Sequence, residues 1–178
     1  RFNSDPWTCT YLDARGRTIR TEVPSIAGNP ARTILNDFAV GGNPLKSSSS
    51  DNAGTVTTES DLLGRTKMYS DAYGNVSTSS YDSYGRLSSR TSPLGVEEFA
   101  YDALDRLTQQ KLDTVVYATI AYDAYSQITS VTYPGGQSVS YARDTLNRLK
   151  KATYGLATGQ VLSDEITRSV GGDIVTGT

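Results

Sequence analysis

Residues 81–87 read Tyr81-Asp82-Ser83-Tyr84-Gly85-Arg86-Leu87, and this stretch decides the fold because the chain repeats it. Residues 101–107 and 122–128 carry the same pattern, 20 and then 21 residues further on. Turn-like tetrads that fit the phase begin at positions 51, 61, 71, 82, 92, 102, 113, 123, 133 and 144, and an isolated early copy spans 13–18. Two kinds of tetrad alternate, so the repeat is 20–21 residues long and contains two turns.

The conserved part of each unit has the chemistry of a tight turn. Asp at the first position caps a nearby backbone N–H, and Gly at the fourth position adopts the left-handed conformation that closes a three-residue hairpin. Asp105, Ser126 and Asn147 replace Gly in three units. Side chains tolerate this conformation less well than Gly, so we expect these turns to be weaker.

The segments between turns predict β-strands. They are about six residues long and rich in Thr, Val, Tyr and Ser, as in 76–81 and 128–133. Turns every ten residues then produce an antiparallel meander in which Tyr81 faces Leu87, with equivalent pairs at Tyr101–Leu107 and Tyr122–Ile128. Residues 97–107 contain good helix formers, but the repeat phase favours a strand and a turn there.

The Tyr-Asp-x-x-Gly-Arg-Leu units at this spacing resemble the YD repeats of the Rhs family, best over 61–149 and more loosely over 10–178. The family includes bacterial Rhs toxins, shell components of toxin complexes and animal teneurins. The resemblance implies an all-β fold, in which the chain is a curved segment of a hollow β-shell. In the bacterial members the shell encloses a C-terminal toxin, so the implied partners are the rest of the same chain and its cargo. The composition, rich in Ser, Thr, Tyr and Gly and poor in Cys, suits an exported bacterial β protein, so we expect the location to be secreted or at the cell surface.

The chain departs from the family pattern in two ways. Its one Asp-Pro step, Asp5-Pro6, lies at the wrong end for the self-cleavage segment, and no toxin domain is visible. Family shells also contain many more repeats. Neither end of the chain has the features of a natural terminus, and we expect a fragment of a longer protein.

Three segments follow from the repeat phase: an irregular β segment at 1–50, the repeat array at 51–149, and degenerate repeats at 150–178. In the first segment we expect Trp7 to plug the core at the start of the sheet, with a ligand platform as the alternative. We expect 31–38 to be a strand, although a short helix is possible, and 46–50 to be a polar loop. In the last segment, 156–161 and 169–174 are candidate turns.

Composition argues against catalysis and most binding chemistry. The net charge is −2 with dispersed Lys and Arg, which gives no electrostatic case for nucleic acid, and no apolar run is long enough to span a membrane. There is no His, which removes His-activated nucleophiles and His metal ligands. The single Cys9 cannot form an internal disulfide, and we expect it to be buried. The adjacent acidic pairs, 97–98 and 164–165, would point to opposite faces of a strand. We therefore predict no enzyme activity, no catalytic or metal site and no cofactor.

Two repeated residue types invite other interpretations. Asp near Gly suggests calcium, but an Arg follows many of these Asp residues and would oppose a cation, so we interpret Asp as a turn cap. Repeated Tyr suggests carbohydrate binding on a Tyr-rich face, although packing between strands is the favoured role; the candidates are Tyr69, Tyr73, Tyr84, Tyr117, Tyr125 and Tyr141. The favoured function is a non-catalytic segment of a shell that encapsulates an exported toxin. The alternative is an adhesive surface module that binds glycans or other cells.

Overall fold

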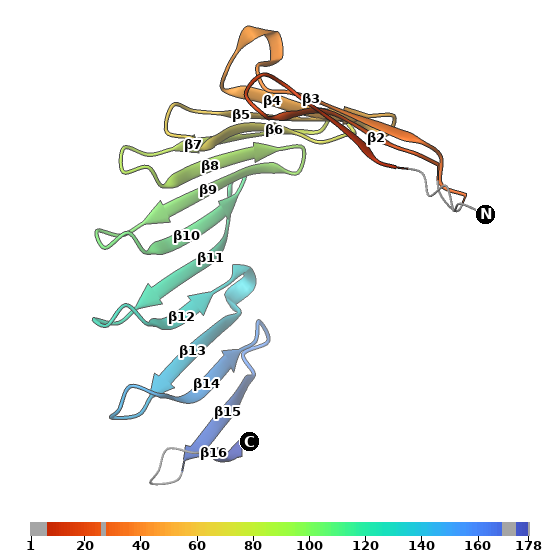
Figure 1. Cartoon of the computed structure of the whole chain (residues 1–178). Coiled ribbons are helices and arrows are strands. Elements are labelled where there is room, and N and C mark those ends of the chain that lie inside the picture. Colours follow the sequence, from red (N-terminus) through yellow and green to blue (C-terminus); the bar gives the residue numbers. More distant parts are fainter. Residues whose placement is uncertain (1–6, 26–27, 169–173, 178) are drawn as a thin grey trace, which may run out of the picture. The chain divides into compact units, whose positions relative to one another are not determined.

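The computed structural model describes residues 7–25, 28–168 and 174–177. In these residues the chain forms sixteen strands and two short 3-10 turns (Figure 1). The strands are β1 (Cys9–Leu12), β2 (Thr18–Val23), β3 (Arg32–Asp37), β4 (Lys46–Asp51), β5 (Gly54–Ser60), β6 (Thr66–Ser70), β7 (Val76–Tyr81), β8 (Leu87–Ser92), β9 (Gly95–Tyr101), β10 (Leu107–Leu112), β11 (Val115–Tyr122), β12 (Ile128–Thr132), β13 (Ser138–Arg143), β14 (Leu149–Gly155), β15 (Val161–Arg168) and β16 (Ile174–Gly177). The 3-10 turns are Val40–Gly42 and Pro134–Gly136.

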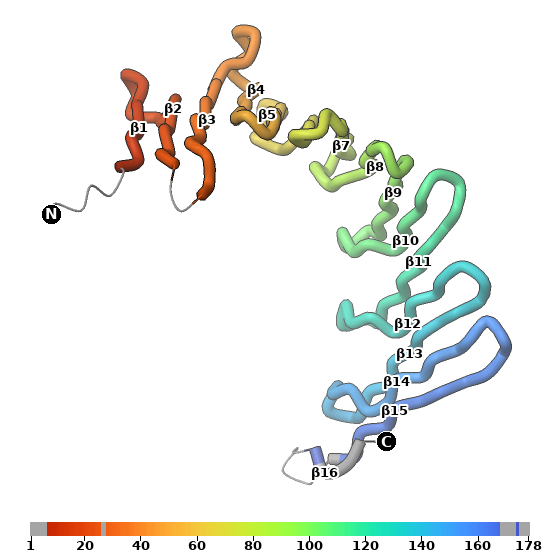
Figure 2. Tube along the Cα trace, turned by 90° about the vertical axis from the view of Figure 1, so that its right-hand side faces the viewer, coloured from red at the N-terminus to blue at the C-terminus, as the bar shows by residue number. Residues whose placement is uncertain are grey.

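The strand order in the sheet follows the order in the chain, from β1 to β16 (Figure 2), and neighbouring strands pair antiparallel from β1 to β7 in unit 1 and from β9 to β16 in unit 2. The predicted meander is therefore confirmed. Tyr101 lies opposite Leu107, and Tyr122 lies opposite Ile128, as the repeat predicts. Residues 97–101 belong to strand β9, so the repeat phase outweighs their local helix propensity.

The chain divides into two compact units. Unit 1 comprises Arg1–Arg86 with Arg90–Leu94, and unit 2 comprises Leu87–Ser89 with Gly95–Thr178. The division into segments 1–50, 51–149 and 150–178 stays a prediction.

The expected polar loop at 46–50 is wrong. Lys46–Asp51 forms strand β4, which pairs with β3 on one side and β5 on the other. Serine is a modest strand former, but pairing on both sides satisfies the backbone of this segment and overrides its propensity. The strand prediction for 31–38 is confirmed by β3, and the turn predicted from residue 156 is confirmed between β14 and β15. The turn predicted at 169–174 falls largely outside the described residues.

Little of the sheet is buried, because it is a single layer. The buried residues among those described are Ala118, Val139 and Ala152, which are 5–8% exposed and lie in unit 2. Other apolar side chains are covered only in part, by neighbours on their own face. No helix in the described residues is long and apolar enough to cross a membrane.

The two faces of the sheet in unit 2 differ in chemistry. Directly opposed residues point to the same side, and successive residues of a strand alternate. The pairing therefore places on one side, here called the apolar face, Ile120, Val131, Val139, Tyr154 and Leu162. It places on the other side, the hydroxyl face, Ala121, Ser130, Ser140, Thr153 and Ser163.

Three expectations about burial are wrong. Trp7 is 87% exposed and plugs no core, and Cys9 is exposed on strand β1. Tyr73, Tyr84 and Tyr125 are 78–91% exposed, because they stand at the third position of their turns, beyond the ends of the strands. A single-layer sheet has no second layer against which these side chains could pack.

Candidate functional site

The repeated feature of this structure is a polar clasp at the turn. In the turn at 61–65, Oδ1 of Asp61 accepts hydrogen bonds from the backbone N–H groups of Leu63 and Arg65, each at 2.9 Å. Oδ2 of Asp61 accepts from Nε of Arg65 at 2.7 Å. One carboxylate thus holds both the backbone of the turn and the side chain that follows it. The Asp–Arg clasps in the described residues are Asp13–Arg17, Asp61–Arg65, Asp82–Arg86, Asp102–Arg106 and Asp144–Arg148.

Two turns keep the clasp without the cation. Nδ2 of Asn75 donates to Oδ2 of Asp71 at 2.9 Å, and the Gln127 backbone N–H donates to Asp123 at 2.9 Å. The hydrogen bonds alone are enough to stabilise the ionised form, because the Asn75 side chain and backbone hold the pKa of Asp71 below its ordinary value. The side-chain hydrogen bond from Arg65 likewise lowers the pKa of Asp61, with its backbone N–H groups adding to the effect. The interpretation of Asp as a turn cap is supported by this geometry.

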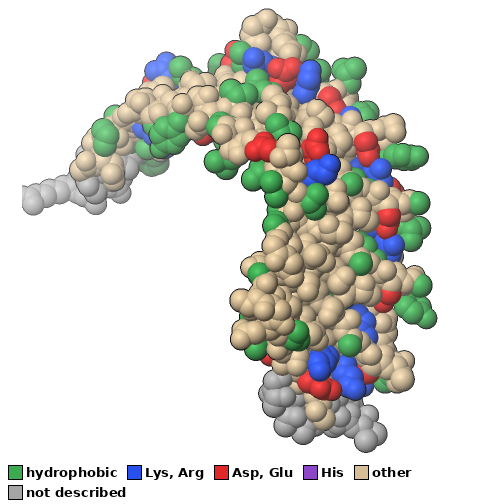
Figure 3. Space-filling model, turned by 180° about the vertical axis from the view of Figure 1, so that it is seen from behind, with side chains coloured by type: hydrophobic (Ala, Val, Ile, Leu, Met, Phe, Trp, Pro, Cys, Tyr) green, Lys and Arg blue, Asp and Glu red, His purple; other side chains and the backbone are tan. Residues whose placement is uncertain are grey.

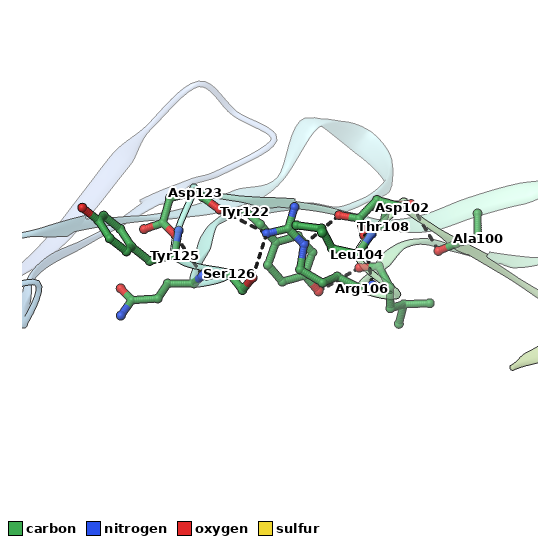
Figure 4. Close-up of polar contacts among 11 residues, drawn as sticks. Ala100, Asp102, Leu104, Arg106, Thr108, Tyr122, Asp123, Tyr125 and Ser126 are labelled. Carbon is green, nitrogen blue, oxygen red and sulfur yellow. Dashed lines mark hydrogen bonds and ion pairs between the residues drawn. The ribbon is translucent and has the colours of Figure 1, made fainter. Parts of the chain in front are cut away.

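The Arg of one clasp also contacts the next hairpin, as the close-up of unit 2 shows (Figure 4). The guanidinium of Arg106 lies 4.6 Å from the ring centroid of Tyr122, which is a cation–π contact. Arg106 also donates to the Asp123 carbonyl at 3.1 Å and to Oγ of Ser126 at 3.3 Å. The Tyr122 hydroxyl reaches back and donates to the Leu107 carbonyl at 2.8 Å.

The same contact recurs in unit 1. Arg65 lies 4.3 Å from the ring centroid of Tyr81, and the Tyr81 hydroxyl donates to the Thr66 carbonyl at 2.7 Å. The Tyr101 hydroxyl makes the equivalent bond to the Leu87 carbonyl at 2.9 Å in unit 2. The Tyr-Asp pair of the motif is therefore a lateral fastener: Asp shapes its own turn, and Tyr ties that hairpin to the Arg of the previous repeat.

One step of the array breaks this fastener. Gln127 stands where the other repeats have Arg, and Arg143 stands where the next repeat would have Tyr. Oε1 of Gln127 and Nε of Arg143 are buried, and neither has a hydrogen-bond partner among the described residues. Both members of the pair have changed together, and we expect this seam to be weaker than its neighbours.

At the opposite margin of the sheet, neighbouring turns are joined by a different contact. The Asp113 carboxylate accepts a hydrogen bond from the Val96 backbone N–H at 2.9 Å, so one hairpin tip caps the next. A Cβ on Gly95 would lie 2.8 Å from both carboxylate oxygens of Asp113, so any larger residue would displace this carboxylate. In unit 1, a Cβ on Gly54 would collide with the backbone carbonyl of Ala72.

The candidate residues for other chemistry do not converge. Glu98 pairs with Lys111 at 3.4 Å and Glu165 with Lys151 at 3.9 Å, so both acidic pairs contribute to ordinary cross-strand ion pairs. Within the described ranges, no group of three or more His, Cys, Asp and Glu side chains could hold a metal. The six Tyr candidates do not share one surface: Tyr73 and Tyr84 lie at opposite ends of β7, whereas Tyr69, Tyr117 and Tyr141 lie on strands.

Sequence reasoning paired Tyr with Leu across the hairpin but missed the Arg–Tyr contact between hairpins. The sequence does contain a signal for this contact. Where Gln127 replaces the Arg at the fifth position of one turn, Arg143 replaces the Tyr that precedes the Asp of the next repeat. The contact joins residues 16 positions apart in consecutive repeats, so it becomes visible only when the repeats are compared as pairs.

The chain was compared with family models, curated proteins and solved structures. A family model described as Teneurin YD-shell matches residues 42–171. No curated protein matches the chain. The chain is similar in structure to a Photorhabdus luminescens Tc holotoxin pore with a mutated TccC3, with a TM-score of 0.68 and 16% identity over 91% of this chain and 10% of that chain.

It is also similar to a crystal structure of TcdB2-TccC3-Cdc42, with a TM-score of 0.58 and 15% identity over 96% of this chain and 11% of that chain. A crystal structure of TcdB2-TccC3 gives a TM-score of 0.55 and 14% identity, again over 96% and 11% of the two chains. This chain spans about a tenth of the length of these proteins. At such identities the likeness establishes the fold.

Proposed function

The chain belongs to the teneurin YD-shell family, and we propose that it is a non-catalytic wall segment of an Rhs-type shell that encloses a C-terminal polypeptide, an exported toxin. The partners are then the remaining repeats of the same parent chain and the enclosed polypeptide. The parent protein acts outside the cell that makes it, as a secreted or surface-bound protein.

The observation that carries this proposal is the lateral fastener. A regular hairpin presents an Arg to the following hairpin and a Tyr to the preceding one, as Arg106 and Tyr122 do. The Tyr hydroxyl bond recurs at three consecutive steps, from Tyr81, Tyr101 and Tyr122, so this part of the array can be extended without a change of design. A wall built from many repeats needs this property.

The glycan-binding alternative is not favoured. A sugar site on a sheet needs aromatic rings side by side on one surface. The Tyr candidates are instead divided between turn tips and strands.

The proposal is tested on the native full-length parent protein by intact mass measurement and limited proteolysis. A closed shell predicts a C-terminal fragment that co-purifies with the repeats and resists protease. The same chain, denatured and then treated with the same protease, is the control, and its C-terminal region should be digested rapidly. If every segment after the repeats is digested equally fast in the native protein, the proposal is wrong.

A further inference from the structure

In a regular repeat, one Tyr supplies both parts of the lateral fastener. The Tyr81 ring lies on the guanidinium of Arg65, and the Tyr81 hydroxyl donates to the carbonyl of the next residue, Thr66. The register of β6 and β7, continued past their last pair, places Tyr81 directly opposite Arg65. In unit 2 the clasps stand along one margin of the sheet, where Figure 3 shows acidic and basic side chains next to one another. An equivalent fastener can therefore be recognised from the register, even where the sequence lacks the Tyr.

The first clasp, Asp13–Arg17, has Phe38 in the position of this Tyr. The register of β2 and β3, continued past the end of β3, places Phe38 directly opposite Arg17. The guanidinium of Arg17 lies 4.3 Å from the centroid of the Phe38 ring, the same distance as in the Arg65–Tyr81 pair. Phe38 thus replaces the ring of the Tyr but has no hydroxyl group.

The hydrogen bond of the fastener comes instead from Asn36, two residues earlier in the chain. Nδ2 of Asn36 donates to the Thr18 carbonyl at 3.0 Å, and Thr18 directly follows Arg17. Residues two apart in an extended chain point to the same face of the sheet, and both Asn36 and Phe38 are half-buried. The two contacts of one Tyr are therefore divided between two neighbouring side chains.

The other end of β3 is also tied to its neighbour as in a later repeat. In unit 2, the carboxylate of Asp113, which follows β10, accepts a hydrogen bond from Val96 near the start of β9. In unit 1, the carboxylate of Asp51, at the end of β4, pairs with the side chain of Arg32 at the start of β3. A guanidinium replaces a backbone N–H, but the two contacts join the same points of consecutive strands.

We propose that residues 9–51 are wall repeats of the same construction as the rest of the array, in which Phe38 and Asn36 together replace one Tyr. Strands β1 to β4 then belong to the wall, although most of their residues precede the family match at 42–171. This inference goes beyond the proposed function, because it concerns how far the repeats extend and does not depend on what they enclose.

On this assignment, residues 39–45 are an insertion at the margin where the regular repeats have their Asp turn. Asp37 caps the Ala39 backbone N–H at 2.8 Å, as the Asp of a clasp caps the second residue after it. The Gly42 N–H then donates to the Ala39 carbonyl at 2.7 Å, so the inserted loop is closed by its own hydrogen bonds. The extra residues leave the pairing of β3 with β4 intact.

The exchange of an Asn amide for a Tyr hydroxyl provides the test. In the full-length parent protein, Asn36→Ala removes the amide, and Phe38→Tyr supplies a hydroxyl at the position it has in regular repeats. Hydrogen exchange of the amides that join β2 and β3, measured by mass spectrometry, reports their local stability. We expect Asn36→Ala to accelerate this exchange roughly fivefold, the factor for one lost hydrogen bond. Adding Phe38→Tyr should return the exchange close to the wild-type rate.

Asn43→Ala is the matched control, because the Asn43 side chain accepts its hydrogen bond from Leu45 within the inserted loop. We expect it to leave the exchange of β2 and β3 unchanged. A second measurement covers the ring and does not require Asn36. Arg17→Gln and Phe38→Leu should together accelerate exchange by less than the product of their separate effects, because each removes the same cation–π contact.

The inference is overturned if Asn36→Ala does not accelerate exchange, or accelerates it equally with and without Phe38→Tyr. It is also overturned if Arg17→Gln and Phe38→Leu act independently. None of these measurements involves the enclosed polypeptide, so such results would leave the shell function to the proteolysis test described above.

Discussion

At the scale of single residues, the fourth position of each clasp imposes its backbone conformation on whatever residue occupies it. Gly64 and Gly85 have φ of 78° and 84°, and Ser126 and Asn147 adopt 63° and 64° in the same slot. The turn thus keeps its left-handed residue even where the sequence has lost glycine. The predicted turn chemistry is confirmed here, and the weaker turns are expected where a Cβ is present.

Gly64 offers a clean measure of this strain, because an added Cβ would meet no atom within 4 Å. We expect Gly64→Ala to lower the free energy of unfolding by about 1–2 kcal/mol, from the left-handed conformation alone. Gly64→Asn is the matched control and should cost less, because Asn tolerates this conformation and already occupies the slot at Asn147. Urea unfolding of the three proteins provides the measurement, and equal losses for Ala and Asn would contradict the explanation.

The ionisation of Asp61 makes the stability contributed by its clasp depend on pH. Its pKa is lowered in the folded protein by the Arg65 side chain and by backbone N–H groups, so the ionised form stabilises the fold above the unfolded pKa of about 4. This stabilisation is lost as the pH falls through the lower folded value.

We expect Asp61→Asn to lower the melting temperature at pH 7 and to reduce the further fall between pH 4 and pH 2. Arg65→Gln keeps the Asp61 carboxylate and its two backbone hydrogen bonds, so we expect this variant to lower the melting temperature at pH 7 by less than Asp61→Asn does. Thermal melts of the wild type and the two variants between pH 2 and pH 7 measure these differences. An Asp61→Asn protein as stable as the wild type at pH 7 would show that the clasp is not stabilising.

At the scale of elements, the phase of the repeat was sufficient to predict the turns and strands of 51–149, because each strand is bounded by turn residues at fixed steps. Prediction was wrong for β4, since Ser47–Ser50 carry no strand signal of their own and become a strand through pairing with β3 and β5. The Arg–Tyr fastener was not predictable from one unit, because its two residues belong to different hairpins. The exposure of Trp7 and Cys9 also required the structure, since burial depends on layers that a repeat pattern does not specify.

The seam between Gln127 and Arg143 should be repairable. Gln127→Arg together with Arg143→Tyr recreates the pair found at Arg106 and Tyr122 and removes two buried polar atoms that lack partners. We expect the double variant to be more stable than the wild type, with a coupling of roughly 0.5–1 kcal/mol between the two changes. A double-mutant cycle by urea unfolding measures this coupling. Strictly additive effects would mean that the two positions do not interact.

At the scale of the whole molecule, stability is the sum of contacts between neighbouring hairpins, because no common hydrophobic core exists in the described residues. Removal of a complete repeat should therefore be tolerated, whereas removal of half a repeat should not. Deletion of two strands leaves the direction of every later strand unchanged. Deletion of one strand reverses these directions and moves every later clasp to the opposite margin of the sheet.

Deletion of 102–122 joins Tyr101 to Asp123 and retains the motif, and we expect a soluble protein with a cooperative thermal transition. Deletion of 113–122 removes one strand and one turn, and we expect low soluble yield or a broad transition. Soluble expression and circular dichroism melts compare the two. Equal behaviour of both deletions would argue against a sheet assembled from two-strand repeats.

The identity of strand order and chain order has a mechanical consequence. A force applied to one end of the chain loads only the last hairpin, which can peel away while the rest of the sheet stays intact. Each released repeat of 21 residues lengthens the chain by roughly 70 Å, at about 3.4 Å per residue. Pulled in this way, the sheet yields one repeat at a time in a series of small steps, so a motor or protease that grips an end can dismantle it without ever meeting one large barrier.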